Sequence, residues 1–310
     1  MRFQVLHETH YRYSSPVVLS QQLLHLTPRT LRWQSCDAHR VAVEPQPGEF
    51  DQRDDYYGNR TVHVLLAVPH EELLVRAESD VRLEPREKAA LAAPQTPWET
   101  VRDRLHALDA PLPLEPAEFL HESPHVETWR ELADYAGKSF PQGRGALEAA
   151  RDLARRIHKD FTFDKKATSV STPLRQVVKQ RRGVCQDFAH LMIGCLRSVG
   201  LSARYVSGYI LTDPPPGRPR LIGADASHAW VSVYCGDQAG WVDIDPTNDC
   251  LVDDEHVTLG WGRDFGDVTP MRGVILGGGE QELEVRVTVT PVDMVQGGLP
   301  DPGRPDKMAI

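Results

Sequence analysis

Residues 181–192 read RRGVCQDFAHLM, a stretch that predicts a helix with a cysteine in its first turn. Helical spacing starts at Phe188, three residues after Cys185, and Gly200 closes the apolar stripe. The rest of the stripe is Leu191, Met192, Cys195, Leu196 and Val199. Unpaired N–H groups and the positive end of the helix dipole favour a thiolate at this position, and Arg181 and Arg182 stand beside it in the sequence. We therefore predict that Cys185 is reactive.

The alternative is that Cys185 only extends the apolar stripe, since free cysteines are among the most buried residue types. Cys195 fits that description, because it lies on the same face but in the middle of the helix, away from the dipole's end. The two cysteines thus form an internal comparison within one helix.

A histidine and an aspartate lie on two predicted strands in residues 227–248, SHAWVSVYCGDQAGWVDIDPTN. If Gly236 and Asp237 form a two-residue hairpin loop, His228 lies directly opposite Asp245. Opposed side chains share one face of the sheet, close enough for an imidazole to donate to a carboxylate. A four-residue loop would move Asp245 one diagonal step from His228, and a three-residue loop would put the two on opposite faces.

Two alternatives remain at this hairpin. Asp243 is a competing partner for the histidine, because it lies on the same face as Asp245 and opposite Trp230 in the two-residue register. His228 and Asp245 also have a structural interpretation, as a strand-end histidine and a turn residue before Pro246.

The chain divides into a strand-rich first part and a mixed second part. Short strands predict an all-β domain over 1–92: 3–13, 38–43, 61–68 and 73–81. A proline-rich connection follows over 93–124, with one short helical pattern near 98–108. Residues 125–295 predict an α+β core with helices first, and 296–310 read as a loose tail. The core's predicted elements are helices over 145–158 and 188–199 and antiparallel strands over 203–211, 228–234, 241–245 and 282–290.

Composition and charge indicate which partners and which cellular compartment to expect. The net charge is -9, with acidic and basic residues intermixed, which argues against nucleic acid as a partner. The beginning of the chain has no signal-peptide pattern and no stretch is apolar enough to span a membrane, so a soluble, cytoplasmic protein is expected. The five cysteines are an odd number without a CxxC pair and read as free thiols.

No cofactor or metal ion is expected. HExxH and EF-hand loops are absent from the sequence, and the charge run Asp253, Asp254 and Glu255 reads as a solvated turn.

Four segments in order resemble the core motifs of the bacterial transglutaminase-like family: GVCQDFAHLM, GLSARYVSGYI, ASHAWVSVY and GWVDIDPTN. HYRYSSPV and DYYGN resemble the family's N-terminal β domain, and GRDFGDVTPMRG resembles its segment after the core. The resemblance implies a papain-like core with a Cys-His-Asp triad, matching Cys185, His228 and Asp245. It also favours Asp245 over Asp243. The superfamily includes amide crosslinkers, peptidases, peptide N-glycanases and members that have lost catalysis, so it does not transfer one activity.

The expected chemistry is acyl transfer from a protein or peptide amide through a thioester on Cys185, with hydrolysis favoured over an amine acceptor. The backbone N–H of Cys185 is the expected oxyanion donor, and Gln180 and Gln186 are candidates for a second donor. The segment 212–227 is a candidate lid. A non-catalytic binding or assembly protein on the same scaffold is the alternative from another class, and the oligomeric state stays open.

Overall fold

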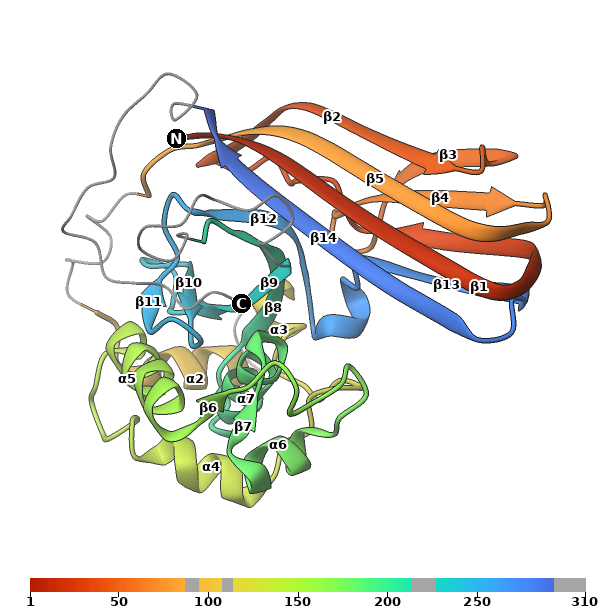
Figure 1. The fold of residues 1–310 in the computed structure, drawn as a ribbon. Coiled ribbons are helices and arrows are strands. Elements are labelled where there is room, and N and C mark those ends of the chain that lie inside the picture. Colours follow the sequence, from red (N-terminus) through yellow and green to blue (C-terminus); the bar gives the residue numbers. More distant parts are fainter. Residues whose placement is uncertain (87–94, 108–113, 213–226, 293–310) are drawn as a thin grey trace, which may run out of the picture.

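The computed structural model describes residues 1–86, 95–107, 114–212 and 227–292, which form an N-terminal sheet beside a mixed core (Figure 1). The N-terminal sheet has seven strands in the order β2-β5-β1-β4-β3, and β13 and β14 also pair with β1. Its strands are β1 (Arg2–Leu24), β2 (Gln34–Glu44), β3 (Glu49–Asp54), β4 (Arg60–Leu66), β5 (His70–Leu83), β13 (Met271–Gly277) and β14 (Gln281–Pro291). The predicted all-β character of this part is confirmed.

The long strand β1 organises this sheet. Buried and more exposed residues alternate along its first half, as expected for a strand with one covered face. That half pairs with β14 on one side and β5 on the other, and the second half pairs with β13 and β4. The register with β5 shifts between Arg12 and Val17, where the strand passes from one set of partners to the other.

One strand prediction is wrong: residues 282–290 belong to the N-terminal sheet and not to the core sheet. β14 pairs with β1 along its length, from Phe3 opposite Pro291 to Tyr13 opposite Gln281. Strand alternation reveals which face is covered but not which strand lies alongside, so the sequence could not give this pairing. The predicted boundary at residue 92 and the tail 296–310 lie outside the described residues.

The core sheet is antiparallel with the order β11-β10-β9-β8-β12, and the predicted α+β class is confirmed. Its strands are β8 (Ala203–Ile210), β9 (Ser227–Tyr234), β10 (Trp241–Asp245), β11 (Cys250–Leu251) and β12 (His256–Gly262). The sequence did not predict β12, whose pairing with β8 shifts register between Thr258 and Gly260 and so breaks the alternation.

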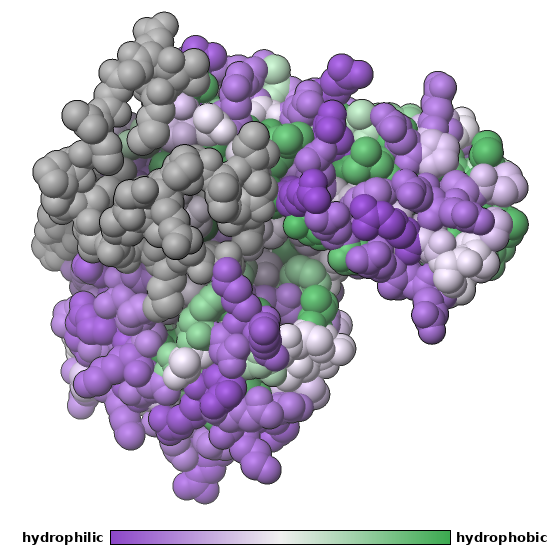
Figure 2. Space-filling view, in the orientation of Figure 1, coloured by the Kyte–Doolittle hydropathy of each residue, from purple (hydrophilic) through white to green (hydrophobic). Residues whose placement is uncertain are grey.

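Helices and short elements complete the core: α2 (Trp98–His106), α3 (Leu114–Ala117), α4 (Arg130–Gly137), α5 (Ala146–Asp160), β6 (Thr162–Phe163), α6 (Leu174–Gln180), β7 (Arg182–Gly183), α7 (Cys185–Ser198) and the 3₁₀ turn η1 (Phe265–Asp267). Apolar faces of α5 and α7 share one buried cluster with the core sheet, including Leu153, Phe188 and Val231. Helix α2 is more than a connection, because Val101 and Leu105 are buried in that cluster. Hydrophilic side chains dominate the surface over the helices (Figure 2).

The N-terminal domain covers the edge strand β12. Gln34 donates from Nε2 to the carbonyl of Thr258 (2.7 Å) and accepts the N–H of Thr258 at Oε1 (2.8 Å). Asn59 makes the same pair of bonds to Trp261, at 2.9 and 3.0 Å. An edge strand presents unpaired backbone groups, and two side-chain amides satisfy them here.

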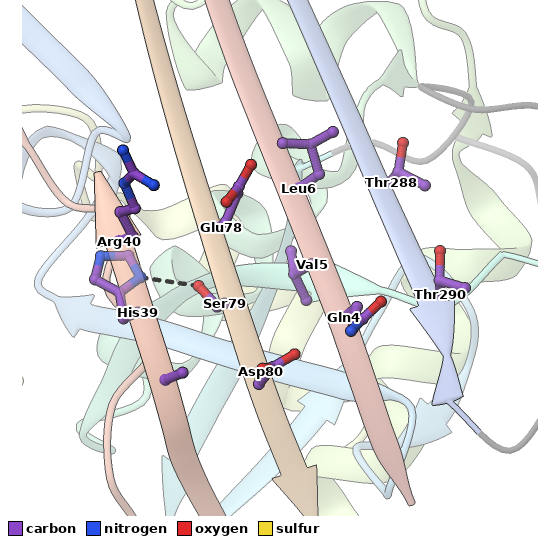
Figure 3. Close-up of a pocket in the computed structure, with 11 residues that line it drawn as sticks. Gln4, Val5, Leu6, His39, Arg40, Glu78, Ser79, Asp80, Thr288 and Thr290 are labelled. Carbon is purple, nitrogen blue, oxygen red and sulfur yellow. Dashed lines mark hydrogen bonds between the residues drawn. The ribbon is translucent and has the colours of Figure 1, made fainter. Parts of the chain in front are cut away.

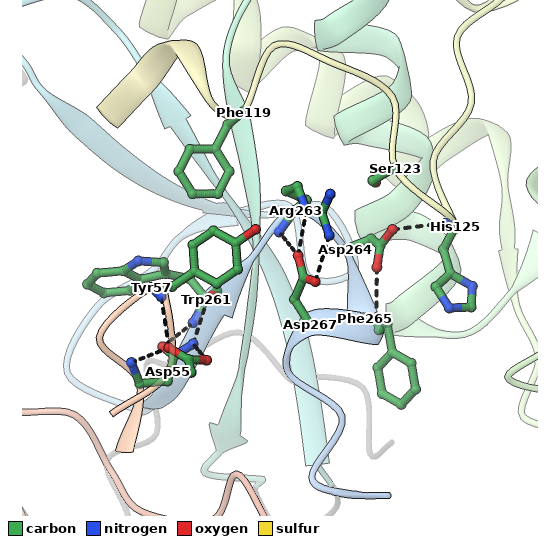
Figure 4. Close-up of polar contacts among 12 residues, drawn as sticks. Asp55, Tyr57, Phe119, Ser123, His125, Trp261, Arg263, Asp264, Phe265 and Asp267 are labelled. Carbon is green, nitrogen blue, oxygen red and sulfur yellow. Dashed lines mark hydrogen bonds and ion pairs between the residues drawn. The ribbon is translucent and has the colours of Figure 1, made fainter. Parts of the chain in front are cut away.

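The polar contacts around η1 link this junction to the helices (Figure 4). Arg263 pairs with Asp267 through Nε at 3.0 Å, and Asp264 accepts the backbone N–H of His125 at 2.9 Å. The buried guanidinium of Arg197, on α7, donates to the carbonyl of Arg263 at 2.7 Å. The segment that contains GRDFGD therefore ties α7 to β12. Among the described residues, no helix combines the length and apolar composition that crossing a bilayer would need.

Candidate active site

Cys185 is the first residue of α7, and its side chain is buried. The chain reaches it through β7, which pairs with β6. The carboxylate of Asp187 accepts the N–H of Val184 at 2.8 Å and the hydroxyl of Thr168 at 2.6 Å. A side chain on Gly183 would meet Asp187 at 2.6 Å, so only glycine allows this close approach. Cys185 thus lies in the first turn of a helix, as the sequence predicts, and Asp187 caps that turn.

The hairpin that carries the other two residues has a four-residue loop, so the predicted two-residue loop is wrong. The N–H of Cys235 donates to the carbonyl of Gly240 at 2.8 Å, which leaves residues 236–239 as the loop. Asp243 pairs with Ser232 and not with Trp230. Both loop lengths keep His228 and Asp245 on one face, so the contact between them survives the change of register.

Asp245 contacts His228 directly. Oδ2 of Asp245 lies 2.7 Å from Nε2 of His228, and both side chains are fully buried. Burial alone would lower the pKa of His228, but the Asp245 carboxylate and the Cys185 thiol together raise it. The carboxylate takes Nε2, and the buried Nδ1 has no hydrogen-bond partner in the described part of the chain. This leaves Nδ1 as the nitrogen available to the thiol.

A dense set of donors holds the Asp245 carboxylate. Oδ1 accepts the backbone N–H groups of Thr247 (2.8 Å) and Asn248 (3.2 Å). Oδ2 also accepts from Nδ2 of Asn248 (2.7 Å) and Nε2 of His256 (3.3 Å). Burial would raise the pKa of Asp245, but His228 and His256 hold it well below its usual range. The carboxylate is therefore ionised and fixed in orientation.

Asp243, which the sequence left open as an alternative partner of His228, bonds a different residue. It accepts from Nη1 of Arg86 at 2.8 Å, and the Arg86 guanidinium stacks over Trp33 at 4.4 Å from the ring centroid. Burial would raise the pKa of Asp243, and Arg86 with Ser232 lowers it. The structure therefore brings Asp245, not Asp243, to His228.

The remaining predicted residues have ordinary surroundings or lie outside the description. Cys195 is fully buried in the apolar cluster, which raises the pKa of its thiol and suits an inert core residue. Gln180 is exposed at the end of α6, and Gln186 is half-buried in the first turn of α7. The candidate lid falls mostly on residues 213–226, outside the described residues.

Three residues of this network escaped the sequence reasoning: Asp187, Asn248 and His256. The contact of Asn248 with Asp245 could have been predicted, because an aspartate at the start of a turn commonly accepts the backbone N–H groups two and three residues further on. No feature of the sequence distinguishes His256 from the other histidines among the thirteen in the chain. The charge run beside it was misread as a solvated turn, since Glu255 is buried and Asp253 and Asp254 are half-buried.

His228, Asp245 and His256 are also the residues of the described chain best placed to hold a metal ion, with their ligand atoms within 4.8 Å of one another. Both imidazoles already contact the same carboxylate oxygen, which a third donor, Asn248, also reaches. Because three donors already occupy this carboxylate oxygen, the group fits a hydrogen-bonded network better than a metal centre.

A separate hollow of about 530 Å³ lies on the N-terminal sheet, across strands β2, β5, β1 and β14 (Figure 3). His39 bonds Ser79 at 2.9 Å on its wall, and Glu78, Asp80 and Thr290 also line it. Cys185, His228 and Asp245 do not line it.

Comparisons with known proteins bear on both parts of the chain. A model described as the transglutaminase-like superfamily matches residues 134–246, and one described as the bacterial transglutaminase-like N-terminal region matches residues 3–82. An uncharacterized protein of Mycobacterium tuberculosis is 42% identical over 299 residues, covering 94% of this chain and 93% of that protein. A protein-glutamine gamma-glutamyltransferase of Pseudomonas aeruginosa is 31% identical over 131 residues, covering 41% of this chain but 19% of that protein.

Among solved structures, a candidate cysteine protease from Cytophaga hutchinsonii has a TM-score of 0.71 at 19% identity. The match covers 95% of this chain and 92% of that chain, so the shared fold extends through both the N-terminal sheet and the core.

Proposed function

The chain belongs to the transglutaminase-like superfamily, and from this premise we propose that it is a thiol-dependent hydrolase of amide bonds in proteins or peptides. The observation that carries the proposal is the arrangement at His228. Its Nε2 is 2.7 Å from Asp245, its Nδ1 is free of other partners in the described chain, and the Cys185 thiol is near enough to influence its pKa. A base oriented by a carboxylate beside a thiol at a helix N-terminus is the arrangement that nucleophilic catalysis needs.

In the acylation step, the Cys185 thiolate attacks the carbonyl carbon of the amide and forms a tetrahedral intermediate. The backbone N–H of Cys185, at the start of α7, points its dipole toward the developing oxyanion. Nδ1 of His228 carries the thiol proton and delivers it to the amide nitrogen, so the C–N bond breaks and the amine leaves. The acyl group stays on sulfur as a thioester.

In the deacylation step, His228 takes a proton from water and the hydroxide attacks the thioester. The C–S bond breaks, the carboxylic acid leaves, and the thiol and His228 return to their starting state. An amine in place of water would give a new amide by the same steps. The name of the Pseudomonas aeruginosa relative favours that second outcome, and it is the alternative we keep.

A binding or assembly protein with an inactive triad is the rival from another class. A buried carboxylate with donors on both oxygens is costly to maintain without use, because each buried polar group must find a partner. The ordered network around Asp245 therefore supports catalysis.

We also propose a cytoplasmic location and no nucleic-acid partner. Cys36, Cys185, Cys195 and Cys235 form no disulfide within the described residues, and the net charge is -9. Disulfide mapping and fractionation of the native host would test the location.

The decisive experiment compares two cysteines of one helix. Peptide amides are screened with the wild-type protein, Cys185→Ser and the matched control Cys195→Ser. The Cys185 variant should lose turnover while the Cys195 variant keeps it. Unchanged turnover in Cys185→Ser would refute the mechanism, and incorporation of an added primary amine as the main product would replace hydrolysis by amine transfer.

A further inference from the structure

A second histidine reaches the triad's carboxylate from the opposite edge of the core sheet. Nε2 of His256 lies 3.3 Å from Oδ2 of Asp245, the same oxygen that contacts His228. The ring packs edge-on against Trp230, with centroids 5.3 Å apart, and lies 6.0 Å from the His228 ring. Its side chain is 1% exposed, so water does not compete for the contact.

The protonation state of His256 follows from its surroundings. The charged or titratable groups that face it are Asp245 on β10, His228 on β9, and Arg86. Burial lowers the pKa of His256, Asp245 opposes that effect, and His228 and Arg86 add to it, so the net pKa is lowered. His256 is therefore neutral at neutral pH. A neutral imidazole can contact an ionised carboxylate only as a donor, which places its proton on Nε2.

The strand that carries His256 is fixed from outside the core. Thr258, two residues along β12, has its N–H and carbonyl both bonded to the Gln34 side chain of the N-terminal domain. On the other side, β12 pairs with β8, where Ile210 lies opposite His256. The imidazole is thus presented to Asp245 from a strand held on both edges.

We propose that His256 is a positioning residue that acts on His228 through Asp245: its N–H withdraws charge from Oδ2 and so limits how strongly the carboxylate, bonded to Nε2, stabilises the protonated form of His228. The inference rests on the proposed function, in which protonated His228 must release its Nδ1 proton to the leaving amine. Because three donors besides His228 remain on Asp245 without His256, the carboxylate stays in place and its charge is what changes. If the protonated imidazole of His228 is stabilised too strongly, it is a poorer general acid near neutral pH.

The test uses His256→Phe, which keeps a buried ring but removes the N–H, and His256→Gln, whose amide nitrogen can occupy the place of Nε2. His7→Phe is the matched control, since His7 is a buried histidine of β1 that bonds Tyr209 and Thr9. We expect His256→Phe to lose about tenfold in kcat with KM within about twofold, and to move the alkaline limb of the pH profile upward by about one unit. His256→Gln and His7→Phe should stay within about threefold of wild type.

An unchanged kcat and alkaline limb in folded His256→Phe would overturn the inference. So would equal losses in the Phe and Gln variants with no movement of the limb, because that pattern is structural damage. If the Phe variant does not fold, His256→Leu takes its place.

A substrate-free measurement separates this inference from the proposed function. Nitrogen-15 NMR titration of histidine-labelled protein reports the pKa of His228 without turnover. A higher His228 pKa in the Phe variant supports the inference even if no amide substrate is ever cleaved, and an unchanged pKa overturns it even in an active enzyme.

Discussion

Replacing Asp245 by asparagine should disable His228, and the size of the effect can be worked from the contacts. In the wild type, burial would lower the pKa of His228, while Asp245 and Cys185 raise it to about 10, so the ring is protonated at pH 7. Asparagine removes the charge that holds this proton. Even if the pKa fell only to the ordinary value of about 6.5, about a quarter of His228 would remain protonated at pH 7, a fourfold loss.

The loss of the hydrogen bond between Asp245 and His228 lowers the rate further, beyond the fourfold loss. A hydrogen bond to a charged group contributes about 1.5–3 kcal/mol, which corresponds to roughly 10- to 160-fold in rate. Together, the two effects predict a loss in kcat/KM of roughly 40- to 640-fold. Asp243→Asn is the matched control on the same strand, and it should stay within about threefold because Asp243 bonds Arg86 and not His228.

The same variant changes how stability depends on pH. The folded-state pKa of His228 is raised, so its stabilising contribution is complete below the unfolded value of about 6.5 and is lost as pH rises toward about 10. Urea unfolding of the wild type should therefore show falling stability across that window, and Asp245→Asn should show a flatter curve. If Asp245→Asn retains kcat/KM within threefold of wild type, or if Asp243→Asn is the more damaged variant, the assignment of Asp245 is refuted.

Three further predictions follow from other contacts. Gln34→Leu should destabilise the protein by about 1–3 kcal/mol in urea unfolding, because it leaves the N–H of Thr258 unpaired and leaves the carbonyl of Thr258 with the N–H of Arg29 as its remaining donor, whereas the exposed Gln52→Leu should change little. Gly208→Ala should cost about 3 kcal/mol, since a Cβ there would meet the Val257 carbonyl oxygen at 2.1 Å. Gly137→Ala is its control, with nothing within 4 Å, and equal melting temperatures for the two variants would contradict the packing argument. Chelator treatment should leave activity intact, and stoichiometric zinc in elemental analysis would instead point to the group of two histidines and Asp245 as a metal centre.

The position of Cys185 could be predicted from sequence because it depends on local physics. A glycine, a short polar stretch and an apolar stripe at helical spacing define where α7 begins, within one turn. The contact between His228 and Asp245 could also be predicted, although the loop was wrong. Two- and four-residue loops differ by one step on each strand, so both keep the two side chains on one face.

Two glycines of the hairpin between β9 and β10 show why its loop length was predicted wrongly. Gly236 and Gly240 both adopt positive φ, 92° and 62°, so the chain needs glycine at the first residue of the loop and again just after it. The two-residue loop predicted from sequence was based on Gly236 and Asp237 and left Gly240 out. Asp237, taken as the partner of Gly236 in a tight turn, instead accepts a hydrogen bond from the Tyr234 hydroxyl.

Pairings that join distant parts of the chain could not be predicted in this way. β14 lies beside β1, and His256 reaches Asp245 across the sheet, because of tertiary packing that leaves no periodic trace in either segment. A buried histidine becomes informative only once its neighbours are known.

These distant contacts make the N-terminal domain part of the framework of the site. Buried residues of β1, β5 and β14 share one cluster with Tyr209 on β8 and Val257 and Leu259 on β12, so the two sheets are joined by apolar packing as well as by Gln34 and Asn59. Strand β12 then carries His256 to the carboxylate that orients His228. A change on the N-terminal sheet that shifts β12 would therefore reach the triad through Asp245. The N-terminal sheet and the core are therefore joined through the strand that carries His256.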